Sequence, residues 1–393
     1  MNLMEHREQP DHTVRSSRRT MQTVLRWVLT AAAAIACCVC TLYLLSTVLL
    51  STGFSLNAPA AAGTNAVVMD RYDTYITNAL SDSLEGVVTI RKEYWLSDED
   101  MIAPRPDPAC FGETDDPATL QWLLEDAQRL LGITDTLFST DKVIKPGSLV
   151  KYYLDETIFM VAWQEVIDNG VYSFSEVKIA HPSQFRRFLA DGTYGSDKQY
   201  LTTEMASSVN AVVAASGDFY KFRGMGVIVY NGTVQRANSY LDVCYIDGTG
   251  DLLFSRVGEL GDMESARQFV EQHDVRFSLA FGPVLVDNYQ RVVPTYYQLG
   301  EVDRNYSRAA LAQLGECHYL MVTVNYDGYY HVPSIYQLAD RMVDLGVEKA
   351  YALDGGQTAT MVVNNTLFNK PDYGTQRKIS DIIYFATAVP EDD

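Results

Sequence analysis

A carboxylate followed by two glycines and two hydroxyl residues lies near the C-terminal end of this 393-residue chain. The segment reads Ala352-Leu353-Asp354-Gly355-Gly356-Gln357-Thr358-Ala359-Thr360-Met361. Glycines directly after an apolar strand let the backbone turn sharply and bring its N–H groups close to a ligand. Asp354 is therefore a candidate for chemistry, although Asp and Gly are also the commonest residues of ordinary turns.

A second carboxylate occupies a similar position in the sequence. Asp218 stands beside Gly217, just after the apolar residues 209–215. Hydrolysis of a glycosidic bond needs two carboxyl groups, one as acid and the other as base or nucleophile. We therefore expect Asp218 and Asp354 to share one site, while the alternative is that each is only a turn residue.

Three arginines are candidates for holding an anionic part of a substrate: Arg223, Arg308 and Arg377. A guanidinium binds phosphate oxygens in a bidentate manner, but an exposed arginine is more often a solvated surface charge. The sequence contains no G-x-S-x-G, Walker or H-E-x-x-H motif, and its His and Cys spacing predicts no metal site. No cofactor is expected to be required, and a bound Ca²⁺ or Mg²⁺ ion among the acidic turns stays open.

The overall charge of the chain indicates which kinds of binding partner are compatible with it. A formal net charge of -19 argues against a nucleic-acid-binding protein, which needs a basic face to displace counterions. An anionic substrate is still compatible with this charge, because a few local arginines can dominate the potential inside a cleft.

The N-terminal region predicts a membrane anchor. Residues 27–54 contain no charged residue, and this uncharged stretch is longer than the roughly 20 residues that span a bilayer as a helix. Five arginines precede this stretch, so residues 1–26 are predicted to be a cytoplasmic tail. Residues 27–54 are then a single-pass signal anchor of the cell membrane, and the rest of the chain is extracellular. The competing interpretation is a signal peptide cleaved near Ala58-Pro59-Ala60, but the apolar stretch is long for that role.

The remaining sequence predicts a linker and a folded domain. Residues 55–150 are interpreted as a membrane-proximal stalk with helices, one of which starts after Asp116-Pro117 and ends at Gly132. Residues 151–393 show short β-runs separated by turn residues, including a strand at 209–215 and a hairpin around Asn231-Gly232. Helices are predicted at 263–272 and 334–345, and Ser334 with Gln337 predicts a capping box at the start of the second. Strands outnumber helices without strict alternation, so we predict an α+β fold with a mixed, largely antiparallel sheet and packed helices.

Five short sequences occur in a fixed order along the predicted domain. They are Gly217-Asp218-Phe219-Tyr220, Asn231-Gly232, Phe281-Gly282-Pro283-Val284-Leu285, Ser307-Arg308-Ala309-Ala310-Leu311 and the segment from Leu353 to Met361. Together they resemble the phosphodiester glycosidase domain family, over roughly residues 150 to 390. That family includes the lysosomal "uncovering" enzyme and exopolysaccharide-associated bacterial proteins, and the version here is similar to those of Gram-positive bacteria.

The resemblance implies a hydrolase acting on a sugar-1-phosphodiester within a cell-surface glycan or exopolysaccharide. Asp354, Asp218 and Arg308 would be the catalytic residues. The substrate-binding residues would be Gly355, Gly356, Gln357, Thr358, Thr360, Gly217, Tyr220, Arg223 and Arg377. The alternative from another class is a non-catalytic protein that binds glycan or assists polysaccharide export.

Overall fold

The computed structural model describes residues 95–97, 102–134, 136–137, 148–167, 170–218, 220–299, 302, 304–326 and 332–391. The predicted cytoplasmic tail and the predicted anchor at 27–54 lie outside these residues. Within the described ranges, no helix combines the length and the apolar character needed to cross a membrane.

The largest sheet has nine strands, and each pairing described in it is antiparallel. Its order is β1 (Phe111–Thr114), β2 (Val150–Leu154), β3 (Ile158–Ile167), β4 (Gly170–Ile179), β15 (His318–Tyr326), β14 (Arg308–Gly315), β16 (Lys349–Leu353), β12 (Val284–Asp287) and β13 (Gln290–Arg291).

Three smaller sheets complete the described β-structure. The five-stranded sheet has the order β18 (Thr366–Leu367), β17 (Met361–Val363), β6 (Val213–Ser216), β19 (Asp381–Phe385) and β5 (Phe185–Leu189). The three-stranded sheet has the order β10 (Leu252–Ser255), β9 (Val243–Asp247) and β11 (Val275–Leu279), and a hairpin joins β7 (Ile228–Tyr230) to β8 (Thr233–Arg236). The Asn231-Gly232 turn of this hairpin has positive φ at both residues, as a tight hairpin turn requires.

Four α-helices occur among the described residues: α3 (Pro117–Leu131), α4 (Thr202–Ser208), α5 (Met263–Gln272) and α6 (Ile335–Asp344). Short 3₁₀ turns are η1 (Pro108–Cys110), η2 (Pro182–Gln184), η3 (Ala190–Gly192), η4 (Gly356–Thr358) and η5 (Asp372–Gly374). The predicted α+β class with largely antiparallel sheets is confirmed, and so are the helices expected after residues 116, 262 and 334.

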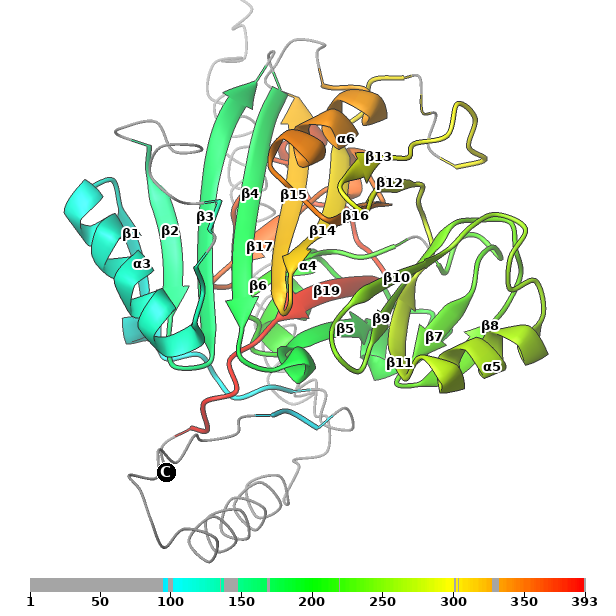
Figure 1. Ribbon diagram of the computed structural model, residues 1–393, viewed down its shortest axis with the longest axis horizontal. Helices are drawn as coiled ribbons and strands as arrows, with labels where there is room; N and C mark the ends of the chain where they lie inside the picture. Colours follow the sequence, from blue (N-terminus) through cyan, green and yellow to red (C-terminus); the bar gives the residue numbers. More distant parts are fainter. Residues whose placement is uncertain are drawn as a thin grey trace, which may run out of the picture. The chain divides into compact units, whose positions relative to one another are not determined.

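The elements form layers because each sheet face is apolar and has to be covered. Helices α3 and α6 lie over one face of the nine-stranded sheet (Figure 1). The opposite face packs on the five-stranded sheet through a core that includes Leu311, Ala215 and Phe385. Helix α4 covers the other face of the five-stranded sheet, where Met205 contacts the core around Tyr384.

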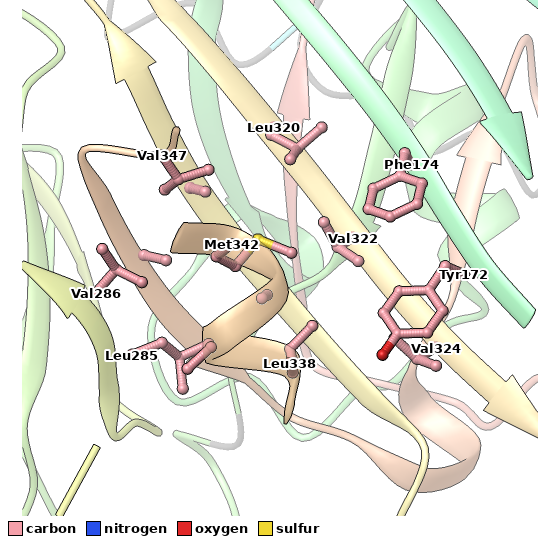
Figure 2. Close-up of a cluster of buried hydrophobic side chains, with 14 of the residues drawn as sticks. Tyr172, Phe174, Leu285, Val286, Leu320, Val322, Val324, Leu338, Met342 and Val347 are labelled. Carbon is pink, nitrogen blue, oxygen red and sulfur yellow. The ribbon is translucent and has the colours of Figure 1, made fainter. Parts of the chain in front are cut away.

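Helix α6 shows how the sequence fixes one of these contacts. Ser334 caps its N-terminus, and the Ser334 and Gln337 side chains form the predicted capping box. Figure 2 shows Leu338 and Met342 of α6 among side chains of the sheet, including Val322 of β15. Burying two such side chains contributes about 3–6 kcal/mol before the entropy of ordering is subtracted. The helix is thereby fixed to the sheet just before the chain enters β16.

The structure differs from the sequence-based prediction at the start of β6 and in the segment interpreted as a stalk. The strand expected at 209–215 begins only at Val213, because α4 ends at Ser208 and the chain turns through Asn210, whose φ is 57°. The segment interpreted as a stalk also contributes to the folded domain. Strand β1 pairs with β2, and Leu120 and Leu123 of α3 are buried in the core.

Candidate active site

Asp354 directly follows the last residue of β16, an interior strand of the nine-stranded sheet. Residues 350–353 are buried, and the antiparallel register pairs Leu353 with Ala309 of β14. If this register is continued by one position, Asp354 comes opposite Arg308, the first residue of β14. Two residues separated by 46 positions in the sequence are therefore neighbours at the end of a strand pair.

Packing requires the first glycine after Asp354, and the backbone conformation favours the second. A Cβ at Gly355 would lie 2.4 Å from the carbonyl oxygen of Ser307, so no larger residue fits there. Gly356 has φ of 65°, a conformation that glycine adopts without strain, and its N–H donates to Ser307 O at 2.7 Å. The glycine turn is thus held directly against the start of β14.

The carboxylate of Asp354 is half-buried and has an unusual environment. Burial raises the pKa of Asp354 to about 6, and the nearby charge of Asp218 acts in the same direction. The Thr358 hydroxyl and the charge of Arg377 oppose this effect. Thr358 Oγ1 lies 2.8 Å from Asp354 Oδ2 and 2.6 Å from Gly355 O, so its single hydrogen is shared between these two acceptors. A carboxylate with this pKa is mostly ionised at neutral pH, yet it is only weakly solvated, as a nucleophile or general base should be.

The second predicted carboxylate, Asp218, follows β6 and lies close to the same turn. The N–H of Asp354 donates to Gly217 O at 3.4 Å, so the two strand ends are adjacent. Asp218 is only 5% exposed, and both of its carboxylate oxygens accept hydrogen bonds. Oδ1 accepts from the N–H of Tyr220 at 2.9 Å, and Oδ2 accepts from the N–H of Ala280 at 2.6 Å.

Asp218 also belongs to a buried charge cluster that sequence reasoning missed. Arg187 Nη2 lies 2.8 Å from Asp218 Oδ1 and 2.9 Å from Asp381 Oδ2, and none of these three side chains is exposed. Arg187 also donates to the carbonyl of Ser278. Burial raises the pKa of Asp381, the charge of Arg187 opposes the rise, and Asp218 adds to it. One guanidinium therefore holds two carboxyl groups behind the site.

The charge cluster leaves no room for a side chain at position 217. A Cβ at Gly217 would lie 1.9 Å from Asp381 Oδ2, which also accepts from the N–H of Asp218 at 3.1 Å. A signal for the cluster exists in the sequence, since residues 185–189 read Phe-Arg-Arg-Phe-Leu. Arginines within an apolar strand require buried partners, but the sequence does not say which carboxylates supply them.

The arginines predicted to bind the substrate lie in different settings. Arg308 is 6% exposed, donates to the carbonyl of Arg304 at 2.5 Å and stacks on Tyr306, with its guanidinium carbon 5.5 Å from the ring centroid. Arg377 is exposed in the segment after η5, where its charge reaches Asp354. Arg223 is exposed in the loop that follows β6. Arg308 is therefore close to Asp354 in the strand register, and Arg377 is the arginine whose charge acts on Asp354.

The other residues predicted to bind the substrate either form hydrogen bonds near the glycine turn or are buried in the protein. Gln357 donates to Thr375 O at 3.2 Å, which connects η4 to the segment after η5. Thr360 is buried, and its hydroxyl lies 2.6 Å from that of Thr202. Tyr220 is 2% exposed, with its ring centroid 5.3 Å from the guanidinium carbon of Arg187. Phe219 of the first motif lies outside the described residues.

No group of three or more His, Cys, Asp or Glu side chains among the described residues is arranged to hold a metal ion. The candidate site consists of a strand-end carboxylate, a glycine turn, a threonine hydroxyl and two arginines. Glycine turns and arginines bind phosphate oxygens, and a weakly solvated carboxylate can act at a carbon centre. Fold and site together define an α+β domain with a weakly solvated carboxylate and arginine side chains near the end of one strand.

Comparison with known proteins agrees with this description. Residues 209–386 match the sequence model of the phosphodiester glycosidase family, which confirms the resemblance predicted from the motifs. No curated protein is similar in sequence to the chain.

Several solved structures resemble the chain at low sequence identity. The catalytic domain of zebrafish N-acetylglucosamine-1-phosphodiester alpha-N-acetylglucosaminidase, auto-inhibited by its pro-peptide, is 17% identical with a TM-score of 0.46, covering 58% of this chain and 83% of its own. A hypothetical protein from Synechocystis is 15% identical with a TM-score of 0.42, covering 60% and 63%. An exported protein from Burkholderia pseudomallei is 14% identical with a TM-score of 0.36, covering 56% and 74%.

Proposed function

We propose that this protein is a glycosidase that hydrolyses a sugar-1-phosphodiester, releasing a free reducing sugar and a phosphomonoester. The observation that carries the proposal is the position of Asp354. Its half-buried carboxylate lies at a glycine turn, next to Arg308 in the strand register and within reach of the charge of Arg377. The family of residues 209–386 supports the same class of reaction.

In the proposed mechanism the two arginines bind the phosphodiester. Arg308 and Arg377 stabilise the charge that develops on the departing phosphate through charge-assisted hydrogen bonds. The N–H groups of the Gly355-Gly356 turn are already used within the protein, Gly355 with the Asp354 carboxylate and Gly356 with Ser307 O, so the turn positions Asp354 beside the phosphate. A phosphomonoester has a second pKa of about 6, so it leaves readily without strong help from a general acid.

Asp354 acts on the other side of the bond. Its carboxylate either attacks the anomeric carbon or takes a proton from the water that does so, and the C–O bond to phosphate breaks. Both oxygens of Asp218 already accept hydrogen bonds from Arg187 and the backbone, so we assign it a positioning role. It connects the buried cluster to the strand end that carries Gly217.

The setting of the enzyme is also part of the proposal. The uncharged residues 27–54 with arginines before them support a single-pass anchor, an extracellular domain and a cell-surface glycan or exopolysaccharide as the substrate. Protease treatment of intact cells tests this arrangement. Cleavage of the domain from outside is the expected result, and full protection would refute it.

The reaction is tested with the purified protein and a panel of methyl phosphodiesters of glucose, galactose and N-acetylglucosamine 1-phosphates. In ¹⁸O-labelled water, C–O cleavage places the label in the sugar, whereas cleavage of a P–O bond places it in the phosphate. We expect labelled reducing sugar from the wild type and none from Asp354→Asn. Asp344→Asn, an exposed carboxylate at the end of α6, is the matched control and should keep full activity.

Three other outcomes would change the assignment. Label in the phosphate would identify a phosphodiesterase instead of a glycosidase. Binding of the panel without any hydrolysis would favour the non-catalytic glycan-binding function. Full hydrolysis by Asp354→Asn would refute the role given to this carboxylate.

A further inference from the structure

Two exposed tyrosines border the candidate active site. Tyr306 is 38% exposed and stacks on Arg308, and Tyr373 is 90% exposed within η5, four residues before Arg377. Single exposed aromatic residues are normal on protein surfaces. Here, however, both tyrosines belong to the segments that carry the two arginines of the site.

The backbone of Tyr373 indicates that its exposed position is held by the fold. Its φ is 61°, a left-handed conformation that residues with large side chains seldom adopt. Such a conformation persists only where neighbouring contacts fix it, and it occurs often at ligand-binding sites. Gly374 N–H donates to Pro371 O at 3.0 Å, which closes the turn around Tyr373.

Further hydrogen bonds attach this turn to the active-site segments. Ser307 Oγ donates to Asp372 Oδ1 at 2.5 Å, so the residue after Tyr306 contacts the residue before Tyr373. Ser307 also accepts from the N–H of Gly356 in the glycine turn. The two tyrosines therefore lie on segments whose positions are tied to each other and to the turn after Asp354.

We propose that Tyr373, together with Tyr306, forms a binding subsite for a sugar ring on the alcohol side of the phosphodiester. This inference rests on the proposed function. In this proposal the arginines hold the phosphate and Asp354 acts at the anomeric carbon, so we assign the exposed tyrosines beside the arginines to the group on the other phosphate ester oxygen. The electron-rich face of a tyrosine attracts the C–H face of a pyranose and excludes water from it. The substrate class is therefore an oligosaccharide or polysaccharide phosphodiester, not a small alkyl ester.

The test compares two esters of one sugar-1-phosphate, N-acetylglucosamine 1-phosphate. In one ester the alcohol is methanol, and in the other it is maltotriose linked through a primary hydroxyl. The measured quantity is the ratio of kcat/KM for the maltotriose ester to that for the methyl ester. We expect this ratio to exceed one in the wild type and to fall about fivefold to tenfold in Tyr373→Asn.

Three variants distinguish the effect of losing the tyrosine ring from the effect of straining the backbone. Asparagine tolerates left-handed φ, so Tyr373→Asn removes the ring without straining the turn. Tyr373→Phe keeps the ring and should keep the ratio. Tyr289→Asn is the matched control, because Tyr289 is 53% exposed with φ of 62°. Tyr289 N–H donates to Glu348 O, just before β16, so Tyr289 lies at the opposite end of that strand from Asp354.

Each outcome decides the proposal. An unchanged ratio in Tyr373→Asn, or an equal fall in Tyr289→Asn, would overturn the subsite. If the wild type hydrolyses neither ester, the proposed reaction fails, and calorimetric binding of the same two esters then tests the subsite by itself. A preference for the maltotriose ester that is lost in Tyr373→Asn supports the subsite, and equal binding of both esters refutes it.

Discussion

Replacing Asp354 by asparagine should remove activity and also make the protein more stable at neutral pH. Burial raises the pKa of Asp354 to about 6 from its ordinary value of 3.8, so keeping this carboxylate ionised in the folded protein costs free energy. A difference of about two between the pKa values, at about 1.4 kcal/mol each, gives about 3 kcal/mol above pH 6. The asparagine side chain would carry no charge and could still accept the hydrogen bond from Thr358.

The sign of the effect follows from proton linkage. Between about pH 4 and pH 6 the folded protein binds more protons at Asp354 than the unfolded chain does. The wild type therefore loses stability through this group as the pH rises over that window. Below pH 4 the group is protonated in both states, and the difference between wild type and Asp354→Asn should largely vanish.

The assay is urea unfolding of the purified wild type and Asp354→Asn at a series of pH values from 4 to 8. We expect the stability difference to grow with pH and to level off at about 3 kcal/mol near pH 7. Asp344→Asn, which changes an exposed carboxylate, should stay within about 0.5 kcal/mol of the wild type throughout. A destabilised or pH-independent Asp354→Asn would refute the argument that burial strains this carboxylate.

Two further predictions concern the residues around Asp354. Gly217→Ala should destabilise the protein by at least about 2 kcal/mol in urea unfolding, because the new Cβ would lie 1.9 Å from Asp381 Oδ2. Gly224→Ala, where no atom lies within 4 Å, should be nearly neutral, and equal effects would contradict this reasoning. Thr358→Val should raise the pKa of Asp354 and shift the acid limb of the kcat/KM profile to higher pH, because the hydroxyl lowers that pKa. An unshifted limb would show that the hydrogen bond does not set this pKa.

The local elements of the fold could be predicted because their signals are local. The capping box at Ser334 predicted the start of α6, and Asn231-Gly232 predicted the hairpin between β7 and β8. Strand β6 was less well predicted, since Val209 caps the C-terminus of α4 and the chain then turns at Asn210, so the first residues of the segment 209–215 are not part of a strand. An apolar run by itself does not distinguish a strand from a buried turn.

The sequence by itself determined the chemistry available at the site, through the residue types and order of Asp218, Arg308 and the segment after Leu353. These features belong to the covalent structure, so they can be recognised without knowing how the chain packs. Only the tertiary structure decided how the groups act. Strand register brings Arg308 beside Asp354, and the buried Arg187 occupies Asp218. Burial and ion pairing depend on segments that are distant in the sequence. They give Asp354 a raised pKa and hold Asp218 against a guanidinium, although both are aspartates that follow strands.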